Sequence, residues 1–169
     1  MIKSIHGYSI LPMHIWLLTH SEELKKANGT GQLICKHLPD HCSLIVWQRN
    51  EPSKVLANLP QESTLVIYPT ALSLEKNATL SVSIEAVDHV IILDGTWQQA
   101  RKMYNRTPYL HNYATYEITG QVSRYVRRKN QQKSGLCTAE TAIYLLQKQR
   151  LTDQVALLKS AFEAFNTVV

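Results

Sequence analysis

The chain has 169 residues, a length typical of a single domain that can bury a hydrophobic core. Hydrophobic residues make up 44% and charged residues 18% of the sequence, which excludes a disordered or low-complexity chain. Eighteen Lys and Arg against 13 Asp and Glu give a net charge of +5, which weakly favours an anionic partner such as nucleic acid.

The apolar stretch IHGYSILPMHIWLL, which begins at Ile5, is the first segment to test for membrane targeting. It is too short and too polar to span a bilayer, and no small-residue cleavage site follows it. The three cysteines are an odd number without a C-x-x-C motif, which is typical of free thiols in a reducing compartment. We therefore expect a cytoplasmic protein without a membrane segment.

The first half of the chain alternates short apolar runs with polar segments. Ile15–Thr19 predicts a strand, Ser21–Ala27 a helix whose N-cap is its first residue, and Asn28–Gly31 a turn that ends this helix. Two further apolar runs, Ser43–Trp47 and Thr64–Pro69, also predict strands. The runs are continuous rather than alternating, as expected of strands covered on both faces.

The segment CKHLPDHC is the one candidate for a metal site, since it contains Cys35, His37, His41 and Cys42. A structural zinc site usually combines two separated pairs of ligands, and the sequence offers no second pair. The alternative is a polar turn around Pro39-Asp40, and we therefore expect no bound metal.

The second half of the chain continues the alternation. His89–Asp94 predicts a fourth strand, and a helix follows from Trp97. Tyr113–Thr119 alternates more, which predicts a fifth strand nearer an edge of the sheet. Two helices at 138–150 and 152–165 close the chain, and the second should pack through a stripe of apolar residues, namely Val155, Leu158, Phe162 and Phe165.

This order of elements predicts one α/β domain with a mostly parallel sheet flanked by helices. Ligands of open α/β sheets bind outside the carboxyl ends of the strands. Three strand ends are therefore candidate sites, namely Thr19-His20, Tyr68-Pro69-Thr70 and Asp94-Gly95-Thr96.

The stretch VIILDGTWQQARKM carries the most chemistry of the three. Gly95 permits a sharp turn, and Thr96 with Gln99 fits a capping box at the start of the following helix. Asp94 is then either a catalytic carboxylate or an acid stabilised by the helix dipole. Trp97 is either a core residue or a surface for stacking a base.

Several motifs resemble those of the DTW-domain family, the tRNA-uridine aminocarboxypropyltransferases. They are LDGTW followed by A-R-K-M, the TH-x2-E-x2-K-x2-NGTG-x-L pattern from Thr19 to Leu33, the LVIYP strand end, and YVRRKNQQKSGLCTAETA. They occur in family order over about residues 15 to 146. We expect one DTW domain over residues 1–169, without the cysteine-rich N-terminal segment of many relatives, and with an extra glycine in the NGTG turn.

The resemblance implies a SPOUT-like, knotted fold. It also implies transfer of the 3-amino-3-carboxypropyl group of S-adenosylmethionine to N3 of a tRNA uridine (acp3U), with 5′-methylthioadenosine released. The implied catalytic residues are Asp94, Thr96 and Trp97, with Asp94 either the base that accepts the N3 proton or a group that binds uracil or the donor's ammonium group. The implied donor-binding residues are Tyr68, Pro69, Leu93, Asp94, Gly95, Thr96, Leu136, Cys137, Thr138 and Glu140.

Basic residues gather shortly before the last of these loops. Arg124, Arg127, Arg128 and Lys129 are either a solvated face or contacts to tRNA phosphates, and Arg101 and Lys102 are further RNA-binding candidates. Two other functions fit the same family features. They are a SPOUT-type tRNA methyltransferase that uses the same donor, and an RNA-binding protein without catalytic activity.

Overall fold

The computed structural model describes residues 3–5, 8–10, 12–76, 81–126 and 135–167. Five strands form its central sheet, namely β3 (His14–Thr19), β4 (Cys42–Val46), β5 (Thr64–Ile67), β6 (His89–Asp94) and β7 (Ala114–Tyr116). The strand order is β4-β3-β6-β5-β7, and every neighbouring pair is parallel. The chain therefore forms an α/β domain with a parallel sheet, as the sequence predicts.

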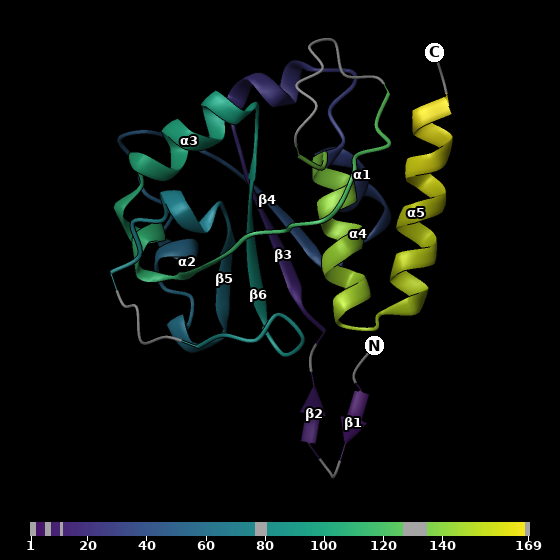
Figure 1. The fold of residues 1–169 in the computed structure, drawn as a ribbon, viewed down its shortest axis with the longest axis horizontal. Coiled ribbons are helices and arrows are strands. Elements are labelled where there is room, and N and C mark those ends of the chain that lie inside the picture. Colours follow the sequence, from purple (N-terminus) through teal and green to yellow (C-terminus); the bar gives the residue numbers. More distant parts are fainter. Residues whose placement is uncertain (1–2, 6–7, 11, 77–80, 127–134, 168–169) are drawn as a thin grey trace.

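Helices cover both faces of the sheet, so the domain has three layers (Figure 1). One face carries α1 (Gly31–His37), α4 (Thr138–Lys148) and α5 (Thr152–Thr167). The other face carries α2 (Lys54–Ala57) and α3 (Trp97–Asn105).

Alternate residues of each strand point into two separate cores. Leu17 of β3 and Ile92 of β6 pack in the core that contains Leu158 of α5. Leu18, the next residue of β3, packs in the opposite core with Met103 of α3. Because residues on both faces of these strands are buried, the sequence shows continuous apolar runs.

Shorter elements complete the chain. A separate antiparallel pair, β1 (Lys3–Ile5) and β2 (Tyr8–Ile10), lies away from the central sheet (Figure 1). The 3-10 helices are η1 (Ser21–Lys25), η2 (Gln61–Ser63), η3 (Thr70–Leu72) and η4 (Pro108–Asn112). No helix in the described part of the chain is both long and apolar enough to cross a membrane.

The predicted strands agree with the structure to within a few residues, and β7 is an edge strand as expected. The prediction for Ser21 is wrong. Ser21 begins a 3-10 helix rather than capping an α-helix, and the N-cap is His20, whose Nδ1 accepts a hydrogen bond from the Glu22 amide at 3.2 Å. The helix α1 and the β1-β2 pair were not predicted. The knotted, SPOUT-like arrangement stays a prediction.

The parallel sheet brings the three predicted strand ends to one edge. Thr19, the last residue of β3, pairs in register with Asp94, the last residue of β6. On the other side of β6, Ile67 of β5 pairs with Ile92, so that Tyr68 follows β5 beside the end of β6. The candidate site is therefore built at the carboxyl end of the central strand.

Candidate active site

The carboxylate of Asp94 occupies the centre of this edge and is only 5% exposed. Its Oδ1 accepts a hydrogen bond from the Thr138 hydroxyl at 2.8 Å, and its Oδ2 accepts one from the Thr19 hydroxyl at 3.3 Å. Thr138 is the first residue of α4, so the carboxylate joins the sheet to a helix that lies 44 residues later in the chain. A carboxylate has about four acceptor sites, and two hydrogen bonds leave part of that capacity for a substrate.

Gly31 closes the site from a third direction. A Cβ atom at this position would lie 2.4 Å from Oδ2 of Asp94 and 3.0 Å from its Cγ. Only glycine therefore lets the start of α1 approach the carboxylate this closely. The second glycine of the NGTG turn has this role, which the sequence did not reveal.

Burial governs the acidity of Asp94. Desolvation raises its pKa to about 6, against the opposing effects of the hydrogen bonds from Thr138 and Thr19. The nearby Glu23 raises the pKa further, and Lys26 lowers it. Glu23 and Lys26 form an ion pair at 2.5 Å, so their opposite effects on the pKa of Asp94 come from two paired side chains. Burial therefore outweighs the two hydrogen bonds, both of which favour the ionised carboxylate.

The NGTG turn and the start of α4 are joined by a hydrogen bond. The Thr30 hydroxyl, which is 4% exposed, accepts a bond from the Ala139 amide at 3.0 Å. The phenol of Tyr125 donates a hydrogen bond to the Asn28 carbonyl. These contacts fix the two segments that place Gly31 and Thr138 against Asp94.

Glu140 holds the local backbone rather than facing Asp94. Its Oε1 accepts hydrogen bonds from the Cys137 amide at 3.1 Å and the Ser123 hydroxyl at 2.6 Å. Its Oε2 accepts a hydrogen bond from the Arg124 amide at 2.8 Å. The carboxylate thereby ties the 123–124 segment to the start of α4, and its predicted contact with the donor stays a prediction.

Cys137 and Leu136 complete the loop before α4. Cys137 is 5% exposed, and burial raises the pKa of its thiol to about 12. The thiol therefore remains protonated at neutral pH and is unsuited to act as a nucleophile. Leu136 is half-buried.

Aromatic rings pack together between the end of β5 and α3. The ring of Tyr68 stacks on Tyr104 with centroids 4.0 Å apart and on Trp97 with centroids 5.9 Å apart. Tyr68 is 3% exposed, and its hydroxyl has no hydrogen-bond partner among the described residues. Trp97 is 41% exposed, so it is a surface ring at the edge of the site and not a core residue.

The start of α3 is fixed by the predicted capping box. The Thr96 hydroxyl accepts a hydrogen bond from the Gln99 amide at 3.2 Å, and Gln99 Oε1 accepts one from the Thr96 amide at 2.9 Å. A Cβ atom at Gly95 would lie 3.0 Å from the same Gln99 oxygen, so the turn is tightly packed. Thr96 therefore has a structural partner, and its predicted catalytic role stays a prediction. Pro69 is half-buried at the N-cap of η3, and Leu93 is buried in β6.

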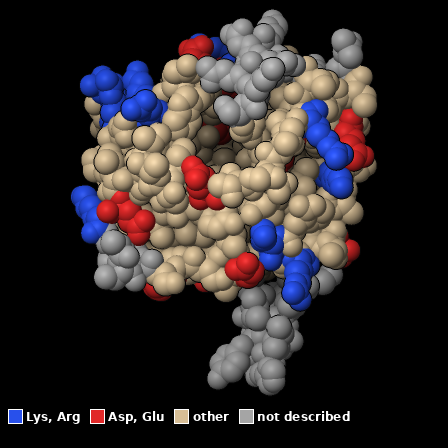
Figure 2. Space-filling view, in the orientation of Figure 1, with Lys and Arg blue, Asp and Glu red and all other residues tan. Residues whose placement is uncertain are grey.

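The predicted RNA-binding residues fall into two groups. Arg101 and Lys102 are exposed on α3, where basic side chains gather (Figure 2). Arg124 is exposed, and its backbone amide is bonded to Glu140 near the start of α4. The remaining three, Arg127, Arg128 and Lys129, lie outside the described residues.

The cysteine and histidine side chains of the CKHLPDHC segment do not form a metal-binding cluster. Cys35 and Cys42 lie with their Sγ atoms 2.7 Å apart, and both are free thiols. Among the described residues, no group of three or more His, Cys, Asp and Glu side chains is placed to hold a metal ion.

The surface between α3 and the start of α4 is hollowed, with acidic atoms at its depth (Figure 2). A buried carboxylate of raised pKa, followed three residues later by an exposed aromatic ring, is an arrangement suited to removing a proton from a planar heterocycle.

Comparison with known proteins gives one family. The family described as DTW domain matches residues 1–169. The chain is 28% identical over 153 residues to tRNA-uridine aminocarboxypropyltransferase 2 of Drosophila melanogaster, covering 83% of this chain and 58% of that protein. The proteins of the same name from Macaca fascicularis and Mus musculus are 28% and 26% identical over 152 residues, covering 85% of this chain and 51% of each relative. The chain thus spans about half the length of the curated relatives it matches, and it has no significant match among solved structures.

Proposed function

The chain belongs to the DTW domain family, and from this we propose that it is a tRNA-uridine aminocarboxypropyltransferase, the activity for which its relatives are named. It transfers the 3-amino-3-carboxypropyl group of S-adenosylmethionine to N3 of a uridine in tRNA. The observation that carries this proposal is the buried Asp94 carboxylate, whose pKa burial raises to about 6.

The reaction requires removal of the N3 proton of uridine, which is only weakly acidic. The nitrogen forms a bond to the first carbon of the aminocarboxypropyl arm as the bond from that carbon to sulfur breaks. The electron pair of the broken bond stays on sulfur, 5′-methylthioadenosine leaves, and the N3 proton passes to Asp94. A carboxyl group with a pKa of about 6 is ionised by about ten to one at neutral pH, and its basicity lies near the working pH.

The residues around Asp94 suit the donor, which must present one particular carbon to the nucleophile. Orientation is the main requirement, because three carbons are bonded to the sulfonium sulfur. The buried hydroxyl of Tyr68, the residue that follows β5, has no hydrogen-bond partner among the described residues, and we propose that the donor supplies one. The turn at Gly95 follows Asp94 directly, and Thr138, at the end of the 136–138 loop, donates a hydrogen bond to its carboxylate, so both segments adjoin the carboxylate. These features support donor binding between the ends of β5 and β6 and the start of α4.

The acceptor uridine fits against the exposed side of the site. Trp97 presents 41% of its surface at the rim, where a base displaced from the tRNA can stack. Arg101 and Lys102 lie on the same helix and are exposed, which supports their proposed contact with phosphates of the tRNA. We further propose a cytoplasmic location and the SPOUT-like fold that the resemblance implies.

Mass spectrometry of nucleosides tests the reaction directly. Unmodified tRNA is incubated with the purified protein and S-adenosylmethionine, with Asp94→Asn as the matched variant. We expect aminocarboxypropyl-uridine with the unaltered protein only. A methylated nucleoside would assign the protein to the methyltransferases instead, and tight RNA binding without any product would indicate an RNA-binding protein without catalytic activity.

A further inference from the structure

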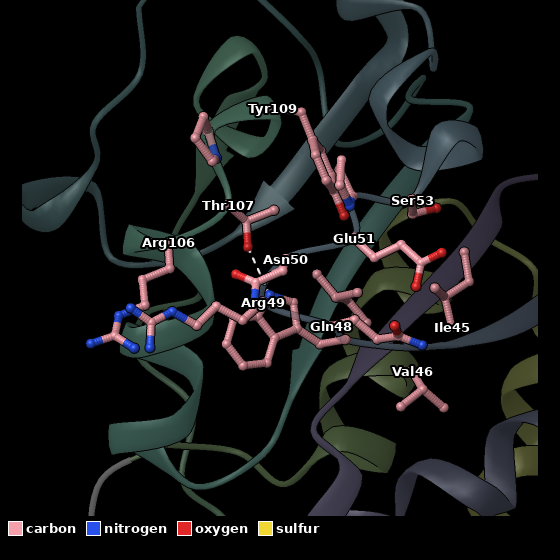
Figure 3. Close-up of a pocket in the computed structure, with 14 residues that line it drawn as sticks. Ile45, Val46, Gln48, Arg49, Asn50, Glu51, Ser53, Arg106, Thr107 and Tyr109 are labelled. Atoms are coloured by element: carbon pink, nitrogen blue, oxygen red, sulfur yellow. Dashed lines mark hydrogen bonds between the residues drawn. The ribbon is translucent and has the colours of Figure 1, made fainter.

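A pocket lies at the carboxyl ends of β3 and β4, on the face of the sheet that carries α2 and α3 (Figure 3). Its volume is about 370 Å³, which lies within the range of pockets that hold small ligands. It is lined by residues that follow β4 and by residues after α3, among them Trp47, Arg49, Glu51, Arg106 and Tyr109. None of these was a candidate in the sequence, because the two segments are more than 50 residues apart.

One residue connects the pocket to Asp94. The amide of His20 donates a hydrogen bond to the Asp94 carbonyl at 2.9 Å. The imidazole of His20 stacks on Trp47, with ring centroids 6.0 Å apart and an interplanar angle of 24°. The pocket and the carboxylate lie on opposite faces of the sheet. Leu18, which lines the pocket, packs in the core with Met103 of α3, whereas the Asp94 carboxylate contacts the starts of α1 and α4. Both adjoin the carboxyl edge of the sheet, because Thr19, the residue after Leu18, pairs in register with Asp94.

The charged groups of the pocket are separated. The side chains of Arg49 and Arg106 extend to one side, and the Glu51 carboxylate lies towards the other (Figure 3). Two guanidinium groups at one opening are typical of phosphate recognition, since each offers several donors in a planar fork. A carboxylate at the other end accepts hydrogen bonds and therefore suits the amino or imide N–H groups of a base.

The aromatic part of the pocket is held in a fixed position. The indole nitrogen of Trp47 donates a hydrogen bond to the Thr107 hydroxyl at 2.8 Å, and Thr107 is 5% exposed. The Trp47 ring is half-buried, so part of it remains accessible in the pocket that it lines. A ring fixed in this way loses little conformational entropy when a base packs against it.

We infer that this pocket binds one nucleotide of the RNA substrate near the target uridine, with its phosphate at Arg49 and Arg106 and its base against Trp47. The inference rests on the proposed function, because it requires an RNA substrate at Asp94. The pocket then sets the register of the RNA, so that the uridine reaches the carboxylate while a nearby nucleotide is held on the other side of the strand ends.

Steady-state kinetics with an unmodified tRNA transcript tests the role in RNA binding. We expect the double variant Arg49→Ala/Arg106→Ala to raise the KM for tRNA by about tenfold or more, with the KM for S-adenosylmethionine within twofold. The slope of log binding constant against log salt should decrease in magnitude by about 1.4, for two lost contacts to a single strand. The matched control is Lys159→Ala, which removes an exposed charge from α5 on the opposite layer. An unchanged KM and salt slope in the double variant would overturn the inference while leaving the proposed reaction intact.

Nucleotide binding to the unaltered protein provides a measurement that does not depend on how the variants fold. The NMR signal of the Trp47 indole N–H, assigned with Trp47→Phe, is followed during titration with 5′-UMP, 5′-AMP and inorganic phosphate. We expect both nucleotides to shift the signal at lower concentrations than phosphate does. A response to phosphate alone, or to none of the three, would overturn the nucleotide site. Nucleotide and tRNA binding through this pocket without any product would instead contradict the proposed reaction.

Discussion

Gly31 packs directly against the carboxylate of Asp94, and a Cβ atom at Gly31 would lie 2.4 Å from Oδ2. The start of α1, the end of β6 and the start of α4 therefore meet at one side chain. The first prediction concerns this contact. Gly31→Ala should displace the carboxylate or α1, which we expect to lower kcat by at least about tenfold and stability by about 1–3 kcal/mol.

The same turn provides the control for this substitution. A Cβ atom at Gly29 would lie 3.5 Å from its nearest neighbours, which is an ordinary contact. Gly29→Ala should therefore retain activity and stability close to those of the unaltered protein. Turnover rates and thermal unfolding of both variants make the comparison, and equal losses would show that the Gly31–Asp94 contact has no special role.

The pH dependence of turnover should report the ionisation of Asp94. Burial raises the pKa of this residue to about 6, and a base must be ionised to accept a proton. We expect kcat at saturating substrates to fall about tenfold for each pH unit below about 6 and to reach a plateau above about 7. If Asp94 instead holds the ammonium group of the donor, the acid limb should appear in the KM for S-adenosylmethionine and not in kcat.

The raised pKa of Asp94, which suits a catalytic base, should lower the stability of the folded protein at neutral pH. The pKa of Asp94 lies near 6 in the folded protein and near 3.8 for an aspartate side chain free in water, so the folded state binds more protons between these values. Stability contributed by this group should therefore decrease as pH rises through the window from about 4 to 6. We expect Asp94→Asn to increase the unfolding free energy by up to about 3 kcal/mol at pH 8 and by almost nothing below pH 4.

Urea unfolding at the two pH values measures this effect. The asparagine side chain retains an acceptor for Thr138 and has nearly the same volume, so the comparison mainly removes the charge. A destabilised variant at pH 8 would show that the ionised carboxylate is stabilised by its surroundings, contrary to the raised pKa.

The sequence predicted the strands that carry this site, because such strands leave strong local patterns in the sequence. Strands buried on both faces appear as continuous apolar runs, and parallel strands place their carboxyl ends together, so that the end at Asp94 could be located in advance. The resemblance implied a donor-binding role for Thr138, which stays a prediction, and the structure shows that its hydroxyl donates a hydrogen bond to the Asp94 carboxylate at 2.8 Å.

The remaining contacts depend on distances between segments that local patterns do not encode. The seven residues of α1 are too few to show a helical period, so the approach of Gly31 to Asp94 was not expected. His20 caps η1 with a ring nitrogen, which is not a usual capping group. The pocket at Trp47 needs two segments that only the folded sheet brings together.

Trp97 should contribute to RNA binding and little to folding. Its ring is 41% exposed and stacks on Tyr68, so its removal leaves no large cavity. We expect Trp97→Ala to raise the KM for tRNA by about fivefold or more, in line with the loss of one stacked base, and to lower stability by less than about 1.5 kcal/mol. Trp97→Phe should recover part of the binding. A loss of several kcal/mol in stability would show that the ring acts mainly as a packing residue.

Thr138 should adjust the acidity of Asp94 through its hydrogen bond. The hydroxyl donates to Oδ1 at 2.8 Å and lowers the carboxyl pKa against the effect of burial. Thr138→Val has a similar shape but no donor, so the pKa of Asp94 should rise above about 6 and the acid limb of kcat should move to higher pH. The loss of turnover should accordingly be larger at pH 6 than at pH 8. Thr138→Ser retains the donor and should keep the limb in place, whereas an equal displacement in both variants would show that the methyl group, and not the hydrogen bond, positions the carboxylate.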